Sequence, residues 1–344
     1  MTSTAVTVGG LAPLTSLRSA TLPGTDIGAE AYFNKINAHG GVNGRMIDFV
    51  GVQDDGDDPI KNLQAAQVLV QQNHVFGLVP VVTPDMGSAP FLEKSQVPAV
   101  GQLFDSQACQ KTYLFGINGC TSPPASSRIF SPSPGVILKQ GVFHGQSGRT
   151  VAITVDDTPA GHQSSQSCTG PFTSTGFKVV GTFFVPASST VADFQPYAQQ
   201  LLHSDRGKPP DVVWTCDSFS TAIGVTAALK SSDFQGALYN SVAYDPRLLQ
   251  VPLLRQALQG TYVYTNFSPV ESNTAAMRGV RGDIHASAPL ATISVEVLAG
   301  YYSAELFTDI LKNAGKKLTA QGFAEAGNNN FTFDAGGALC PVTF

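Results

Sequence analysis

The first hundred residues alternate short apolar segments with helix-like segments, and this alternation constrains the fold more than any other feature. Residues 4–11 are apolar and rich in β-branched side chains, which is typical of a buried strand. Thr25 is expected to cap the helix that follows, and Gly40 and Gly41 supply its left-handed stop. Residues 45–52 then form the next strand. A strand, a helix and a second strand in this order predict a parallel α/β unit.

The same alternation continues along the chain. Asp57 or Asp58 followed by Pro59 predicts a helix start, and that helix runs to about Asn73. Further expected elements are strands at 75–82, 97–101, 150–155, 177–185, 211–216 and 237–240, and helices over 84–95, from Gly161, over 193–203, 219–230 and 292–313. The Ser- and Pro-rich stretch 120–135 separates two series of strands and helices. Two such series predict an α/β fold with two parallel sheets and helices on both faces.

Length and charge narrow the functional classes. A chain of 344 residues suits two cores better than one. A net charge of −5, with no Lys/Arg cluster, argues against nucleic-acid binding. No apolar run reaches the roughly 18 residues that a membrane helix needs. The N-terminus has no basic region followed by an apolar stretch, so either the protein is cytosolic or an export signal has been removed.

The cysteines bear on that choice. There are five of them, without CxxC pairs or metal-like spacing, so at least one thiol lacks an internal partner. Cys109 and Cys120 lie in one loop-like stretch and can close a short disulfide, which favours an oxidising compartment. The alternative is that all five are free buried thiols.

The sequence carries no pattern typical of catalysis. No GxGxxG follows a strand and no GxxxxGK[ST] occurs, so no nucleotide cofactor is expected. The six histidines lack paired metal-binding spacing. The acidic run 54–58 does not fit a calcium loop and is interpreted as a solvated turn with a helix cap. Trp214, inside an apolar strand, is expected in the core. We therefore expect that the protein is not an enzyme and that it binds no metal ion and no cofactor.

Several longer segments resemble the type I periplasmic binding proteins, in the branch that binds leucine, isoleucine and valine. The segments are INAHGGVNGR at 36–45, DDGDDP at 54–59, FVPASSTVADFQPYAQQL at 184–201, VVWTCDSFSTAIGVTAAL at 212–229 and the Tyr301 segment VLAGYYSAEL. The resemblance implies two doubly wound parallel-sheet lobes joined by a three-segment hinge. Lobe I would comprise 1–120 and 268–328, and lobe II 121–267 and 329–344.

The candidate ligand-binding residues follow from the general rule for parallel α/β sheets. Ligands bind beyond the carboxyl ends of the strands, where helix N-termini expose N–H groups. The residues at those positions are Arg18, Thr83, Pro84, Asp85, Leu103, Phe104, Asp105, Ala160, His162, Asp217, Phe219, Asn240 and Ser241. The resemblance implies that Thr83 and residues 103–105 hold a ligand carboxylate. Phe104 and Phe219 are candidate pocket walls.

Two departures from the family pattern concern the ligand. Amino-acid binders of the family carry an acidic residue for the ligand ammonium, whereas this chain has Asn240 or Ser241 there. Many also carry an aromatic residue where this chain has Ala160. Because an uncompensated ammonium is costly to bury, a standard α-amino acid is disfavoured unless Asp105 or Asp217 acts as the counter-ion. The expected solute is a small neutral or anionic organic compound, with Arg18 a candidate anion partner.

The resemblance also implies a function. The chain would be an extracytoplasmic, monomeric solute-binding protein that closes on its solute about the hinge and delivers it to the permease of an ABC importer. Nucleic acid is not an expected partner. Two alternatives remain open: a ligand-sensing regulator or receptor domain of the same fold, and a hydrolase of the doubly wound class. Reduced cysteines would favour a cytosolic regulator, and turnover of a bound compound would favour the enzyme.

Overall fold

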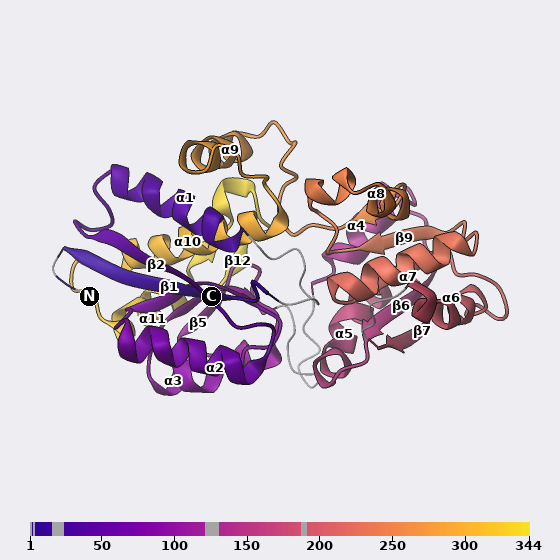
Figure 1. Cartoon of the computed structure of the whole chain (residues 1–344), viewed down its shortest axis with the longest axis horizontal. Coiled ribbons are helices and arrows are strands. Elements are labelled where there is room, and N and C mark those ends of the chain that lie inside the picture. Colours follow the sequence, from indigo (N-terminus) through magenta and orange to yellow (C-terminus); the bar gives the residue numbers. More distant parts are fainter. Residues whose placement is uncertain (1, 3, 16–23, 121–130, 187–190) are drawn as a thin grey trace. The chain divides into compact units, whose positions relative to one another are not determined.

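The chain divides into two compact units, each with its own parallel sheet (Figure 1). The computed structural model describes residues 2, 4–15, 24–120, 131–186 and 191–344. The first unit contains the described residues up to Cys120 and those from Asn266 to Phe344. The second contains the described residues between Cys120 and Asn266. Each unit is α/β, as the alternating pattern predicts.

The first unit has a five-stranded parallel sheet in the order β2-β1-β3-β4-β5. The strands are β1 (Ala5–Ala12), β2 (Met46–Asp54), β3 (Gly77–Thr83), β4 (Ala99–Leu103) and β5 (Leu114–Gly116). The helices are α1 (Thr25–Ala38), α2 (Pro59–Gln67), α3 (Ala89–Lys94), α9 (Ala275–Ser287), α10 (Val295–Ala314) and α11 (Ala320–Asn328), with short helical turns η1 (Val68–Gln72), η2 (Ser106–Ala108) and η6 (Ala335–Gly337). A two-stranded antiparallel pair, β11 (Thr332–Phe333) and β12 (Val342–Thr343), completes the unit.

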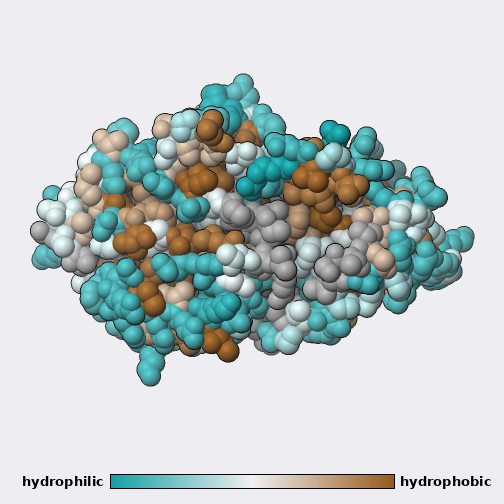
Figure 2. Space-filling model, viewed as in Figure 1, coloured by the Kyte–Doolittle hydropathy of each residue, from teal (hydrophilic) through white to brown (hydrophobic). Residues whose placement is uncertain are grey.

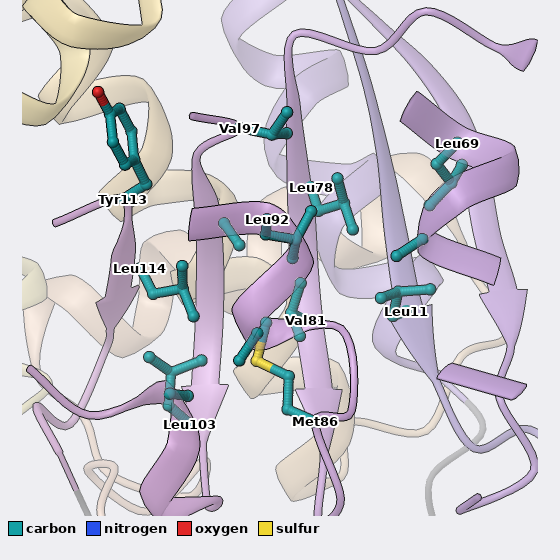
Figure 3. Packing of buried hydrophobic residues seen from close by; sticks show 14 of the residues in the cluster. Leu11, Leu69, Leu78, Val81, Met86, Leu92, Val97, Leu103, Tyr113 and Leu114 are labelled. Carbon is teal, nitrogen blue, oxygen red and sulfur yellow. The ribbon is translucent and has the colours of Figure 1, made fainter. Parts of the chain in front are cut away.

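The core of the first unit lies partly between this sheet and its flanking helices. Figure 3 shows a cluster in which Leu78 and Val81 of β3 lie among side chains from neighbouring strands and from α3. β3 is buried at every position, which is why it appears in the sequence as an unbroken apolar run. Burial of such a strand on both faces holds it firmly in the sheet. The polar residues then lie at its carboxyl end, as Thr83 does in β3.

The second unit repeats the plan with a five-stranded parallel sheet in the order β10-β9-β8-β6-β7. The strands are β6 (Thr150–Asp156), β7 (Lys178–Val185), β8 (Val212–Cys216), β9 (Ala237–Asn240) and β10 (Tyr262–Val263). The helices are α4 (Ser133–Gly141), α5 (Pro159–Ser174), α6 (Gln195–Leu202), α7 (Phe219–Ser231) and α8 (Pro252–Leu258), with turns η4 (Val191–Phe194) and η5 (Pro246–Gln250). Trp214 is buried in the core, as predicted.

Alternate positions of each strand in the second unit face opposite cores. On one face, Val151, Ile153 and Trp214 pack with the α5 residues Cys168 and Phe172. On the other face lies a second cluster, whose strand members are Ala152, Val185, Val213 and Leu238 and whose helical members include Ala198, Leu201, Val225, Ala228 and Leu229 of α6 and α7. The period of two that separates these faces also decides where the polar residues near the strand ends point.

Three local expectations are wrong. Thr25 is not the cap of α1: Gly24 occupies that position, and Thr25 is fully buried as the first helical residue. The helix expected over 84–95 begins only at Ala89, because residues 84–88 are held as a loop by hydrogen bonds described below. The acidic turn is not simply solvated, since Asp55 is fully buried, although Asp58 does cap α2 by accepting from the backbone N–H groups of Ile60 and Lys61.

The C-terminal residues 329–344 pack in the first unit, although the family resemblance assigns them to the second lobe. The Phe344 ring lies 5.5 Å from the Phe115 ring of β5, and Phe267 pairs with Leu339 through a β-bridge. Burial of these apolar side chains ties the tail to the first sheet.

Two disulfides are present, one in each unit. Cys109 and Cys120 are joined as predicted, with Cα atoms 5.3 Å apart. Cys168 of α5 and Cys216 of β8 form a second bridge, with Cα atoms 6.0 Å apart, which the spacing of the cysteines did not reveal. Cys340 is an exposed free thiol.

The surface of the second unit carries several exposed large apolar side chains. They include Val136 and Ile137 of α4, Leu249 of η5, Leu253 of α8 and Val251 between these two elements. Figure 2 shows hydrophobic surface over α4 and α8. Within the described part of the chain, no helix combines the length and the apolar character needed to cross a bilayer.

Candidate ligand-binding site

The carboxyl edge of the first sheet brings Thr83 and Leu103 side by side. They are the last residues of β3 and β4 and are partners in the register of these strands. The Leu103 side chain is buried in the core cluster (Figure 3), so only its backbone is available to a ligand. Thr83 is also buried, and its hydroxyl oxygen has no hydrogen-bond partner of good geometry, although it lies near enough to Asp55 to lower the pKa of that carboxyl.

A buried polar network holds the loop that follows Thr83. Asp55 accepts from the Asn62 side chain at 2.8 Å and from the Asp57 backbone N–H at 3.0 Å. Asn62 in turn accepts from the backbone N–H of Ser88 at 3.0 Å. Burial raises the pKa of Asp55, and these hydrogen bonds oppose that shift. The network fixes residues 84–88 in the non-helical path that the sequence pattern did not predict.

Asp105, which lies two residues after the end of β4, also holds this loop in place. Its carboxylate accepts from the backbone N–H of Met86 at 3.0 Å and from that of Gln107 at 2.8 Å. Each oxygen accepts one backbone hydrogen bond and keeps further lone pairs, so Asp105 holds the loop and stays a candidate counter-ion for a ligand ammonium. Its neighbour Phe104 is about one-third exposed, while Pro84 and Asp85 are partly exposed.

In the second unit a row of buried polar side chains crosses three strands near their carboxyl ends. Thr154 of β6 is in register with Thr215 of β8, which is in register with Asn240 of β9. Residues in register on parallel strands point to the same face, so these three side chains form one row. Each is 1% exposed or less. The row two residues deeper on this face consists of Ala152, Val213 and Leu238, so the sheet face changes from apolar to polar at its edge.

Asp217 follows β8 and joins this row. Its carboxyl group accepts a short hydrogen bond from Thr154 Oγ1 through Oδ2, while Oδ1 is buried with no partner. The neighbouring Asp156 ends β6 and accepts from the backbone N–H of Ser218 at 2.6 Å and from its hydroxyl at 3.0 Å. Burial, and secondly the charge of Asp156, raise the pKa of Asp217 well above its usual range. Burial beside a second carboxyl group therefore favours the protonated form of Asp217.

Only the oxygen of the Asn240 side-chain amide makes hydrogen bonds with described residues. Its oxygen accepts from the backbone N–H groups of Val242 and Ala243 at 3.2 and 3.0 Å, whereas Nδ2 is buried with no partner. Ser241, the next residue, is partly exposed. Phe219, the first residue of α7, packs against the small cluster of Ile223, Leu248 and Leu258 and is also partly exposed.

His162 belongs to a different part of the same edge. It lies in the first turn of α5, and its Nε2 is 2.8 Å from an oxygen of Asp157. Its ring stacks on Phe184 of β7, with the centroids 3.8 Å apart. Both partners of the pair are about half exposed, so the histidine is held at the surface and remains open to solvent. Ala160 lies in the same turn of α5.

The structure thus groups some candidates and separates others. Asp217 and Asn240 belong to one buried row, whereas His162 stands with Asp157 and Phe184. Arg18 lies outside the described residues. Sequence reasoning missed Thr154, Thr215 and Asp156, although a threonine just inside the end of each of two apolar strands was a usable signal.

The described side chains at these edges supply hydrogen-bonding groups. In the described ranges, no three His, Cys, Asp or Glu side chains are grouped so that they could hold a metal ion. What the edges offer is buried donors and acceptors on rigid strands, together with aromatic and backbone surface. Such sites recognise small molecules by shape and hydrogen bonding.

Three solved structures with this fold are distant from this chain in sequence. A fatty acid ABC transporter substrate-binding protein from Thermomonospora curvata is 17% identical, with a TM-score of 0.81 over 100% of this chain and 85% of its own. A branched-chain amino acid transporter substrate-binding protein from Streptococcus pneumoniae, in complex with isoleucine, is 16% identical, with a TM-score of 0.72 over 97% of this chain and 91% of its own. A solute-binding protein from R. palustris, in complex with 4-hydroxybenzoate, is 17% identical, with a TM-score of 0.71 over 99% of this chain and 88% of its own.

These structures confirm the type I periplasmic binding protein fold that the sequence segments predicted. No curated protein matches the sequence at a significant level. The family model described as periplasmic binding protein matches residues 5–344, which is nearly the whole chain. The chain therefore belongs to the periplasmic binding protein family.

Proposed function

We propose that this protein captures a small organic solute outside the cytoplasm and delivers it to the permease of an ABC importer. The family match over residues 5–344 is the observation that carries the proposal. The carboxyl edges of both units would bind the solute, because Thr83, residues 103–105, Asp217 and Asn240 lie there. Arg18, Pro84, Asp85, Ala160, His162, Phe219 and Ser241 remain candidates for further contacts. The proposed role includes no catalytic step.

The ligands named for structurally similar proteins share one chemical group. They are a fatty acid, isoleucine, 4-hydroxybenzoate and 3,4-dihydroxy benzoic acid, and each contains a carboxyl group. This agrees with the expectation that Thr83 and the backbone at 103–105 hold a carboxylate. We therefore favour a small carboxylic acid as the solute.

Other observations support the location and the partner. Two disulfides are typical of proteins outside the reducing cytosol. The exposed apolar side chains of α4, η5 and α8 provide surface of the kind that contacts another protein.

The test is a thermal-shift screen of the purified protein against fatty acids, hydroxybenzoates, branched-chain amino acids, their α-keto acids and amides. A solute that binds only the folded form stabilises it, by about 2.7 kcal/mol at one hundred times its Kd. Thr83→Val should weaken a carboxylate ligand, whereas Thr332→Val, on the exposed face of β11, should not. Absence of any concentration-dependent shift would count against solute binding. A solute that binds but does not stimulate the reconstituted importer would support the regulator instead.

A further inference from the structure

The buried row in the second unit contains polar atoms that the described residues leave unsatisfied. Asp217 Oδ1 and Asn240 Nδ2 are both buried, and neither has a hydrogen-bond partner among the described residues. Asp217 is 7% exposed and Asn240 is fully buried. Leaving such a group unpaired costs roughly 1–3 kcal/mol, so a partner from outside the chain is favoured at each atom.

The other polar side-chain atoms of the row already make hydrogen bonds within the chain. Asp217 Oδ2 is occupied by the Thr154 hydroxyl, and the Asn240 oxygen by two backbone N–H groups. The Thr215 hydroxyl, between them in the row, donates to the Tyr239 carbonyl oxygen. Asp156 has both oxygens occupied by Ser218.

The chemistry of the two atoms is that of donors. An amide Nδ2 can only donate. Asp217 is buried beside Asp156, which raises the pKa of its carboxyl group and favours the protonated form, and that form can donate. Neither atom supplies the negative charge that an ammonium would need in a buried site.

We infer that this row recognises an oxygen acceptor of the solute, such as a keto, hydroxyl, amide or carboxylate oxygen, rather than an ammonium. The inference rests on the proposed solute-binding function and specifies the solute class. Carboxylic acids that carry a second oxygen acceptor should bind, and the α-amino acids that match them in shape should bind poorly.

The first experiment compares matched ligands by calorimetry. Isoleucine and its α-keto acid differ chiefly in the replacement of the ammonium by an oxygen, and 4-hydroxybenzoate is compared with 4-hydroxybenzylamine. The second pair tests the carboxylate contact at Thr83, because the amine replaces the carboxyl group; a third pair, 4-(hydroxymethyl)benzoate and 4-(aminomethyl)benzoate, keeps the carboxylate and changes only the second group. In the first and third pairs the oxygen member should bind at least about tenfold more tightly, as expected where a buried polar site is left unpaired by the wrong ligand. Tighter binding of the ammonium member would overturn the inference while supporting the proposed function.

Variants test the two side chains. Asp217→Leu removes the donor and should weaken the best ligand about tenfold, whereas Asp217→Asn restores a donor and should recover most of that loss. Asn240→Asp places a carboxylate where a donor is inferred and should weaken an anionic ligand further. The control Asp233→Asn makes the same chemical change as Asp217→Asn, but on an exposed turn, and should leave the affinity for the ligand unaltered. If Asp217→Asn were as damaging as Asp217→Leu, Asp217 would be a charged ligand and the inference wrong.

A measurement without solute keeps the inference separate from the proposed function. The infrared difference spectrum between wild type and Asp217→Asn at neutral pH should show a protonated carboxyl band. A carboxylate band would overturn the inference even if solutes bind. If no compound binds at all, the proposed function fails and the inference with it. A structure of the complex with only ordered water on Asp217 Oδ1 and Asn240 Nδ2 would also overturn the inference.

Discussion

At the residue scale, acidic side chains in this protein are used in different ways according to their surroundings. Asp105 and Asp156 accept hydrogen bonds from nearby backbone and hydroxyl groups and thereby order loops. Asp217 is buried beside another carboxylate, and this raises the pKa of its carboxyl group. A sequence shows all three as aspartates at strand ends. Their roles differ only because desolvation and hydrogen bonding differ in the fold.

Glu305 is a further case, and it gives a testable pH dependence. It lies on α10 in the lining of a cavity of about 210 Å³ that contains none of the candidate ligand residues. Burial and, secondly, Asp309 raise the pKa of Glu305 from 4.5 to about 7, with Asp283 adding to the shift and Lys35 and Lys312 opposing it. The folded state therefore binds the proton more tightly than the unfolded state does.

The sign of the effect follows from linkage. Between about pH 4.5 and 7 the folded state holds more protons, so this group lowers the free energy of unfolding as the pH rises. Glu305→Gln cannot ionise, so its stability relative to wild type should increase across that window by up to about 3 kcal/mol. Urea unfolding at several pH values measures this. If the free energies of unfolding of wild type and Glu305→Gln changed in parallel with pH, the pKa of Glu305 would not be raised in the folded state.

At the scale of elements, two helices of the first unit cross closely because each contributes a glycine. A Cβ atom at Gly28 of α1 would lie 1.8 Å from the Val297 carbonyl oxygen of α10, and one at Gly300 of α10 would lie 1.9 Å from the Thr25 carbonyl oxygen of α1. In the sequence these glycines only weaken a helix prediction. Their function in packing becomes visible once the two helices, far apart in the chain, are placed together.

Gly28→Ala and Gly300→Ala should each destabilise the protein by roughly 2–4 kcal/mol, because backbone on the neighbouring helix cannot move aside cheaply. Gly279→Ala and Gly282→Ala on α9 meet nothing within 4 Å and are the matched controls. They should be neutral or stabilising by up to about 1 kcal/mol through helix propensity. Denaturant midpoints compare all four. If the substitutions in α1 and α10 destabilised the protein no more than those in α9, the backbones of α1 and α10 would not be in close contact.

The second disulfide shows what element patterns cannot predict. The strand of Cys216 and the helix of Cys168 are both visible in the sequence, but their pairing depends on which face of β8 meets α5. The same limit applies to Thr154 and Thr215, since their row exists only through strand register. Short elements such as β5 and the tail pair β11–β12 are set by tertiary contacts and give little periodic signal.

The two disulfides should contribute unequally to stability. The Cys168–Cys216 bridge spans 48 residues and the Cys109–Cys120 bridge spans 11. Loop-closure entropy then predicts losses of about 4 and about 3 kcal/mol when each pair is replaced by alanine. Chemical unfolding of the two double variants checks the order. A larger loss for the Cys109–Cys120 pair would show that native-state contacts, rather than chain entropy, dominate.

At the scale of the whole molecule, each unit has its own apolar core. Among the described residues, one cluster between Leu11 and Ala324 contains only residues of the first unit, and three further clusters lie between Leu138 and Tyr264 in the second. Each disulfide also closes within one unit. Domains with separate cores commonly depart from a single two-state transition.

We therefore expect the solute-free protein to unfold in two calorimetric transitions, with a total enthalpy above the van't Hoff enthalpy of either. Replacement of Cys168 and Cys216 by alanine should lower one transition, and Gly28→Ala should lower the other, because each change lies in a different unit. A solute that binds only the folded form should raise the transition of each unit that contacts it. A single transition that both variants lower equally would show that the units unfold as one, and would require a coupling that their separate cores do not suggest.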